Sequence, residues 1–233
     1  MAVTPQTNEA FLREVDEELR REQAATLWRR YGRLLIGAII AGLAAFGGYL
    51  YWQNEQLKAA GAQGEQVSAL FQTLGSGNVA AAQKPLAELA ASSRAGYKAT
   101  ALLLQGDVAL QKNDLKGAAR IFGTIADDAS LPAPFRDLAR IRQTSAELDA
   151  LKPEQVIARL KPLAVKGGAW LGSAGEMMAV AYIQMNRPDL AGRLYADIAQ
   201  DESQPQSLRT RAVQMAGTLG TDAIRDKQGK TTQ

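Results

Sequence analysis

Paired acidic residues are the first candidates for chemistry in this chain, at Asp127-Asp128 and Asp201-Glu202. Two neighbouring carboxyl groups could serve as a general acid and a general base. The chain contains no histidine and no cysteine, so it cannot assemble a Ser–His or Cys–His nucleophile or the usual nitrogen and sulfur ligands of zinc. Both acidic pairs fall at equivalent ends of predicted helices, where capping or a solvated turn explains them. The sequence therefore predicts no catalytic residue, no metal site and no cofactor, and indicates that the protein is not an enzyme.

Glycines lie on both sides of Trp170, at positions 167, 168, 172 and 175. They are not accompanied by the lysine pattern of a phosphate-binding loop. We interpret this segment as a loop that packs Trp170 onto the rest of its domain. The alternative is an exposed Trp170 that contacts a partner protein, since tryptophan is enriched among the residues that dominate interfaces.

The composition limits the other classes of function. The formal net charge is +3, and the basic residues are scattered along the chain, so we do not expect nucleic acid as a partner. The absence of cysteine means that any exported domain must be held together by packing alone, without disulfides.

The longest uncharged stretch, LLIGAIIAGLAAFGGYLYW, is Leu34–Trp52, with 19 residues. As a helix it would extend roughly 28 Å, at about 1.5 Å per residue. A bilayer has a hydrocarbon core of about 30 Å. Aromatic residues mark both ends of the stretch, as at membrane interfaces: Trp28, Tyr31, Tyr49, Tyr51 and Trp52. We predict a retained transmembrane helix.

Charges on either side of the span predict its orientation. Arginines precede it at positions 20, 21, 29, 30 and 33, whereas the first basic residue after it is Lys58. Since an excess of arginine marks the cytoplasmic side, we expect the N-terminus inside and the C-terminal part outside. The expected parts are a cytoplasmic tail at 1–33 with an amphipathic helix from Asn8, the span at 34–52, a helical domain at 53–220 and a disordered tail at 221–233.

Small residues recur within the span at Gly37, Ala41, Ala45 and Gly48. Small side chains at helical spacing let a second helix approach closely. We predict that these residues form a helix-packing face, although Gly and Ala are also common in membrane helices generally.

Two segments that lie 73 residues apart match position by position. FGTIADDASLPAPFRDLA begins at Phe122, and YADIAQDESQPQSLRTRA begins at Tyr195. Half of 73 is about 36, and apolar residues fit this shorter period before and between the two segments: Leu86, Leu89, Ala90, Leu160, Leu163 and Ala164. A period in the mid-thirties with two helices per unit is typical of an α-solenoid.

A solenoid needs small residues where the two helices of a unit cross. In the clearest unit, Gly106 and Ala118 occupy these positions, and Phe122 fills the next layer of the core. Ala191 and Tyr195 occupy the positions of Ala118 and Phe122 in a later unit. These residues resemble a degenerate tetratricopeptide repeat. The fold class predicted is therefore all-α, with a single N-terminal transmembrane helix followed by a tetratricopeptide-like α-solenoid of about four helix-pair repeats.

Prolines mark where helices should stop and start. Pro132 and Pro134 stand between two units. Pro85 and Pro162 instead lie inside segments expected to be second helices, so we expect these helices to start late or to kink.

The full layout resembles a known family. It runs from EVDEELRREQAATLWRRYGRLL through a span ending in YLYWQ to repeats containing GYKATALLLQGDVAL and LPAPFRDLARIR. This arrangement resembles the YfgM-like family of tetratricopeptide proteins, ancillary subunits of the SecYEG translocon in the bacterial inner membrane. The resemblance implies translocon subunits and a periplasmic chaperone as partners.

Two functions follow as hypotheses. The first is a membrane-anchored periplasmic interaction module that assists the translocon and chaperones in protein export. The alternative is a scaffold or regulatory adaptor of an envelope or cell-division complex, which would use the cytoplasmic tail.

Overall fold

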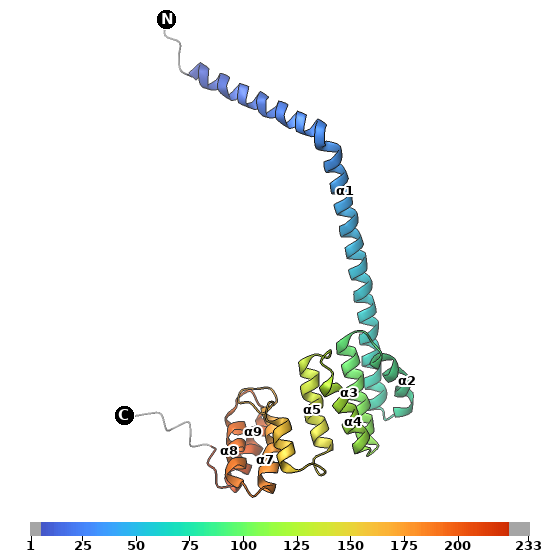
Figure 1. Ribbon diagram of the computed structural model, residues 1–233, viewed down its shortest axis with the longest axis vertical. Coiled ribbons are helices and arrows are strands. Elements are labelled where there is room, and N and C mark those ends of the chain that lie inside the picture. The colour runs from blue at the N-terminus through green and yellow to red at the C-terminus, as the bar shows by residue number, and fades with distance from the viewer. Residues whose placement is uncertain (1–5, 224–233) are drawn as a thin grey trace, which may run out of the picture. The chain divides into compact units, whose positions relative to one another are not determined.

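The computed structural model describes the backbone of residues 6–223 and the side chains from position 28 onward. Residues 224–233 of the disordered tail expected at 221–233, and the side chains of the expected amphipathic helix up to position 27, lie outside the described residues. All regular structure in the described part is helical (Figure 1): α1 (Gln6–Gly75), α2 (Val79–Ala90), α3 (Ala95–Gln111), α4 (Leu115–Asp127), α5 (Ala133–Ala146), α6 (Pro153–Leu160), α7 (Leu171–Gln184), α8 (Pro188–Gln200) and α9 (Gln206–Thr218). The chain divides into two compact units between Ala62 and Gln63, and each unit is described by itself.

The first unit is the part of α1 that ends at Ala62. It carries a stretch that is long and apolar enough to cross a membrane, with a mean hydropathy of 1.9 in its most apolar window and no part of that window buried. Leu43, Phe46 and Tyr51 are 65%, 59% and 70% exposed. By length and composition, this stretch could span a membrane.

The second unit is a row of antiparallel helix pairs. The end of α1 shares a core cluster with α2 through Leu70. Contacts then join α3 to α4, α5 to α6 and α7 to α8, and α9 packs on α8 as a final single helix. This agrees with the predicted all-α repeat architecture of about four helix pairs. Helix α1 is unbroken from residue 52 to Gly75.

The turns inside the pairs repeat at nearly constant spacing. Gly77, Asn113 and Asn186 each adopt a positive φ, of 79°, 59° and 56°. Glycine and asparagine are the residues that enter this left-handed region most easily. Asn113 follows Gly77 by 36 residues, and Asn186 follows Asn113 by 73. The backbone conformation of these turns therefore repeats with the same period as the sequence.

The third pair departs from the others, because α6 is only 8 residues long and ends at Leu160. We expected a longer second helix that included Leu163 and Ala164, and that expectation was wrong. Pro162 has no N–H to continue the helical ladder, and the chain instead makes turns as far as Trp170. Pro85 differs again, because it lies inside α2, which begins at Val79 and so does not start late.

Gln204 anchors the turns between α6 and α7 through hydrogen bonds. Its side-chain oxygen accepts a hydrogen bond from Gly172 N at 3.2 Å, and its amide nitrogen donates to Gly168 O at 3.3 Å. Asp201 adds a bond from Gly167 N at 3.1 Å. Leu131, 73 positions earlier, is the equivalent of Gln204 in the repeat. Leu131 is buried and apolar, and no segment of this kind lies beside it.

The core of the second unit consists of successive clusters rather than one centre. Each cluster is formed mainly by adjacent helices, as in a stack in which every repeat touches its neighbours. Gly106 faces Phe122, and a Cβ at Gly106 would lie 2.3 Å from the ring. Ala118, Ala191 and the Tyr195 ring are also buried. The five repeat residues therefore lie where small and large side chains interlock.

The second unit continues beyond α9 to the end of the described chain. Ala223 is buried, and its carbonyl accepts a hydrogen bond from the Gln200 side chain at 3.2 Å. Thr221 packs so closely on Gly192 that a Cβ there would lie 2.1 Å from the Thr221 hydroxyl. Residues 221–223, which we expected to begin a disordered tail, are thus packed.

Candidate functional site

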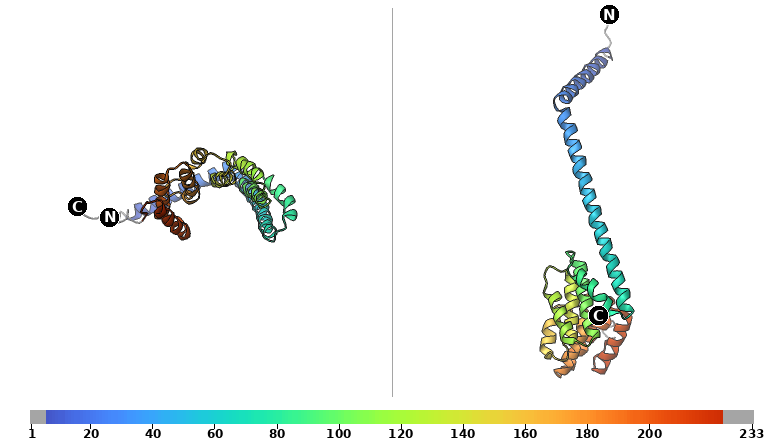
Figure 2. Two further views of the ribbon diagram at one scale, coloured as in Figure 1. Left: turned by 90° about the horizontal axis from the view of Figure 1, so that it is seen from below. Right: turned by 90° about the vertical axis from the view of Figure 1, so that its right-hand side faces the viewer.

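The odd-numbered helices of the second unit share one face. Contacts join α3 to α5 and α5 to α7. Arg142 on α5 pairs with Asp107 on α3, and Arg211 on α9 pairs with Glu176 on α7. We call this surface the odd-helix face. The helices follow one another along an arc (Figure 2, left), and those on the inner side of an arc approach most closely, so the odd-helix face is the inner one.

A pocket opens on this face between α7 and α9. Its volume is about 280 Å³, and it is lined by Leu148, Glu176, Met177, Val180, Tyr195, Arg211 and Met215. We call it the α7–α9 pocket. Most of its lining is apolar, and its charges belong to one ion pair.

That ion pair has two hydrogen bonds. Arg211 Nε and its terminal nitrogen each donate to Glu176 carboxylate oxygens at 2.7 Å. The Glu176 hydrogen bond raises the pKa of Arg211 further above its already high value. A planar guanidinium on a carboxylate fixes both side chains in orientation. The pair therefore presents no net charge to the pocket.

Tyr195, a buried residue of α8, also lines the pocket. Burial raises the pKa of its phenol, and the Glu176 carboxylate raises it further, while the charge of Arg211 acts in the opposite direction. The phenol is consequently neutral at ordinary pH and can donate a hydrogen bond.

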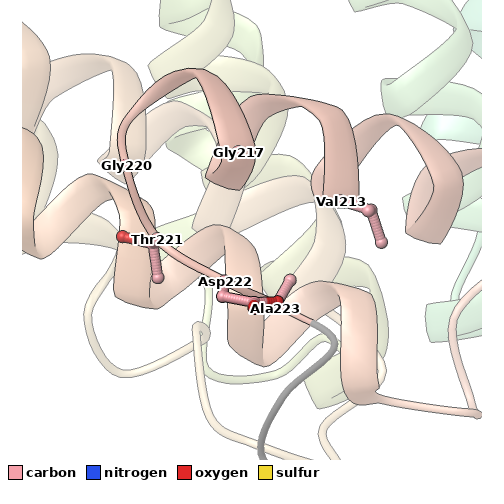
Figure 3. Close-up of a pocket in the computed structure, with 6 residues that line it drawn as sticks. All are labelled: Val213, Gly217, Gly220, Thr221, Asp222 and Ala223. Carbon is pink, nitrogen blue, oxygen red and sulfur yellow. The ribbon is translucent and has the colours of Figure 1, made fainter.

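Further pockets lie elsewhere in the second unit, and two of them differ in lining. One of about 650 Å³ lies against α4 and the end of α5, with Leu115, Lys116, Arg120, Glu147 and Asp149 among its lining residues. The other, of about 380 Å³, lies between α9 and the segment that follows it (Figure 3). The second pocket is lined partly by glycine and small side chains, and offers few groups for recognition.

The acidic pairs Asp127-Asp128 and Asp201-Glu202 lie where α4 and α8 end. Asp128 and Asp201 are the C-cap residues of α4 and α8, and each accepts hydrogen bonds from the serine two residues later. The Ser130 hydroxyl, followed by Lys98, lowers the pKa of Asp128 to about 2. Hydrogen bonds from Ser203 likewise lower the pKa of Asp201. Both carboxylates are ionised and engaged, which suits a structural turn rather than proton transfer.

No group of three or more potential ligands among Asp, Glu, His and Cys comes together in the described part of the chain. Among the described residues, the odd-helix face therefore carries no candidate metal site.

Trp170 is partly buried at the beginning of α7. It packs against a cluster that contains Ile141, Leu160 and Met178. This position is compatible with the packing interpretation, and a contact between Trp170 and a partner stays a prediction.

The small residues of the span are fully accessible in the first unit. No side chain comes within 4 Å of a Cβ placed at Gly37 or Gly48, and Ala41 and Ala45 are exposed. A helix that packs on them stays a prediction.

Sequence reasoning missed the α7–α9 pocket. One available signal was the spacing of charges: Asp107 and Arg142 lie 35 residues apart, as do Glu176 and Arg211. Opposite charges separated by one repeat length indicate pairing between successive repeats.

Comparison with known proteins identified one family. The family model described as a tetratricopeptide repeat-like domain matches residues 26–217. Searches of curated proteins and of solved structures found no match.

Proposed function

The chain belongs to the tetratricopeptide repeat-like domain family, and from this membership we propose that it binds a protein segment on its odd-helix face. Domains of this kind are protein-interaction modules rather than catalysts. The observation that carries the proposal is the α7–α9 pocket, an apolar recess on the inner face with an internally neutralised ion pair at its edge. An apolar recess with a few fixed polar groups is the usual form of a recognition site.

We further propose that α1 anchors this module in the bacterial inner membrane with the second unit in the periplasm. The length and apolar character of α1 support a membrane span. The orientation rests on Arg29, Arg30 and Arg33 before the span, against a first basic residue at Lys58 after it. An anchor of this kind would raise the local concentration of the module near a membrane machine.

The machine proposed is the SecYEG translocon, with a periplasmic chaperone as second partner. This assignment rests on the resemblance of the tail, span and repeats to the YfgM-like family. The alternative is a scaffold or adaptor of an envelope or cell-division complex, in which the helical tail before the span would carry a signal inward.

Photocrosslinking in native membranes tests these assignments. Photoreactive residues would replace Ala41 and Ala45 in the span and Trp170 in the second unit, and the adducts would be identified by mass spectrometry. Recovery of translocon subunits and a periplasmic chaperone would support the export function, whereas only envelope or division proteins would favour the adaptor. A set of adducts no richer than background would rule out both.

Deletion of residues 1–27 separates the two functions further. An adaptor that signals inward should lose its function, whereas a periplasmic export module should keep it, provided that membrane insertion is verified for the shortened chain.

A further inference from the structure

The pocket of about 650 Å³ lies where the beginning of α4 meets the end of α5 and the turn that follows it. We call it the α4–α5 pocket. It shares no lining residue with the α7–α9 pocket, so what it binds does not depend on the proposed protein interaction. Its volume lies within the range of roughly 300–1,000 Å³ found for small-molecule sites. A molecule with one or two rings therefore fits inside it.

Part of the lining of the α4–α5 pocket is apolar. Leu115 and Ala119 contribute this surface from α4, and Ala146 and Ala150 contribute it from the end of α5 and the following turn. Leu115 is 47% exposed although it is apolar. A ligand that covers Leu115 removes this surface from water, which contributes about 25 cal/mol per Å² to binding.

The α4 side of the pocket is basic. Lys116 and Arg120 both line it, and they lie one helical turn apart on α4. In the described part of the chain, neither side chain forms an ion pair with a carboxylate. Residues four apart on a helix are neighbours, and like charges at this spacing repel each other. An anion placed between the two side chains relieves that repulsion.

The carboxylates nearby do not cancel these charges. Glu147 also lines the pocket, but it is paired with Arg159, and both side chains of that pair are more than two-thirds buried. Asp114, at the N-terminus of α4, accepts a hydrogen bond from Gly117 N at 2.8 Å and is not part of the lining. Two unpaired cations thus face a single unpaired carboxylate in the lining, Asp149. The balance of charge favours an anionic ligand.

We propose that the α4–α5 pocket binds a small organic anion. Lys116 and Arg120 hold its charged group, and Leu115 and Ala119 contact its apolar body. A guanidinium can donate two parallel hydrogen bonds to a carboxylate or phosphate, and an ammonium adds a compact point charge. A short fatty acid and a compact aromatic acid both have this chemistry, and the experiment distinguishes them.

Three probes of nearly equal size test the charge preference: 2-naphthoate, 2-naphthylmethanol and 2-naphthylmethylammonium. Calorimetric titration would use the full chain in nanodiscs of zwitterionic lipid, with the heat of empty nanodiscs subtracted. We expect 2-naphthoate to bind about tenfold more tightly than the alcohol, and the ammonium to bind most weakly. Equal affinity for the three probes would overturn the proposal. The affinity for 2-naphthoate should also fall as salt is added, because both cations are exposed.

Lys116→Gln provides the test variant, and Lys112→Gln provides its matched control. Lys112 is also an exposed lysine without an ion pair in the described chain, and it lies outside the pocket lining. Lys116→Gln should weaken 2-naphthoate binding about fivefold and leave the alcohol within about twofold, whereas Lys112→Gln should change neither. Equal losses in the two variants would overturn the proposal. Circular dichroism verifies that both variants are folded.

Asp149→Asn predicts a change of the opposite sign. Removal of the one unpaired carboxylate should strengthen 2-naphthoate binding by about threefold, because a repulsive charge is lost. Weaker binding in this variant would contradict the proposed position of the anion.

Octanoate identifies the kind of anion. Tighter binding of octanoate than of 2-naphthoate indicates a fatty acid, and the reverse order indicates a compact ring; either supports the proposal if Lys116→Gln weakens the tighter ligand. Failure of the proposal would leave the protein interaction standing, because the photocrosslinking probes lie at residues outside this pocket.

Discussion

Gly106 shows how a single position sets the spacing of a helix pair. The place of its missing side chain is filled by the Phe122 ring, which is completely buried. Close approach of α3 and α4 therefore depends on the absence of a Cβ at this point. Gly96, on the same helix, has no atom within 4 Å of its Cβ position and carries no such restriction.

These two glycines give a matched pair of substitutions. Gly106→Ala should destabilise the second unit by about 1–3 kcal/mol through overpacking against Phe122. Gly96→Ala should be neutral or stabilising by up to about 1 kcal/mol, because alanine favours the helix. Urea unfolding followed by circular dichroism would measure both, and an equal effect at the two positions would contradict the packing argument.

Asp128 gives a prediction about pH at the same scale. Its folded pKa of about 2 lies below the ordinary value of 3.8, so the ionised carboxylate is favoured by folding. The corresponding stability is present above about pH 4 and is lost as the pH falls towards 2. Asp128→Asn should therefore lower the unfolding midpoint at pH 6, and the difference from the parent should shrink at pH 2.

Ser130→Ala serves as the control for this effect. The Ser130 hydroxyl is the largest cause of the shift, so its removal should reduce the same pH dependence without changing the charge at position 128. Midpoint differences that are independent of pH in both variants would contradict the assignment.

At the scale of the element, the short α6 is the clearest irregularity of the repeat array. The chain between Leu160 and Leu171 forms turns instead of a helix, and it is tied to the turn between α8 and α9 by Gln204 and Asp201. Gln204 takes the place that the buried Leu131 has in the equivalent repeat, because backbone groups near Gln204 need hydrogen-bond partners. The irregular segment is thus held by specific hydrogen bonds.

Gln204→Leu should release this segment. Its loss leaves Gly172 N–H without its acceptor at a buried site, which typically costs about 1–3 kcal/mol. Hydrogen exchange should rise at residues 165–172 while the protection of α3 and α4 remains unchanged. Uniform loss of protection over the whole second unit would show that Gln204 supports global folding rather than this segment.

At the scale of the whole molecule, the two units have opposite surface character. The apolar stretch of α1 is exposed, whereas the second unit encloses its apolar residues between adjacent helices. This contrast is the one expected if α1 spans a bilayer, as proposed above.

Cysteine labelling would test the proposed orientation, since the parent chain has no cysteine to remove. Single variants Gln23→Cys and Ser173→Cys would be treated with a membrane-impermeant maleimide in intact spheroplasts. Position 173, which is exposed on α7, should react directly, and position 23 should react only after the membrane is opened. The reverse pattern would contradict the arginine-based orientation.

The periodic features could be predicted from the sequence because they depend on local chemistry. The uncharged run of 19 residues specifies an apolar helix whatever surrounds it. The 73-residue match specifies repeated helix pairs, because each pair must present the same apolar and small positions to its neighbours. Asn113 and Asn186 repeat the same left-handed turn for the same reason.

Only the tertiary structure determined where α6 ends and where the candidate site lies. At Pro162 the sequence predicted a late start or a kink, whereas α6 ends at Leu160. Gln204 and Asp201 accept hydrogen bonds from backbone groups at Gly172 and Gly167, and this anchoring is visible only in the tertiary structure. The α7–α9 pocket joins residues from 148 to 215, which meet only once the repeats have stacked and curved. The sequence by itself thus determined the repeating unit and the apolar anchor, while the packing between units decided which side chains share a pocket.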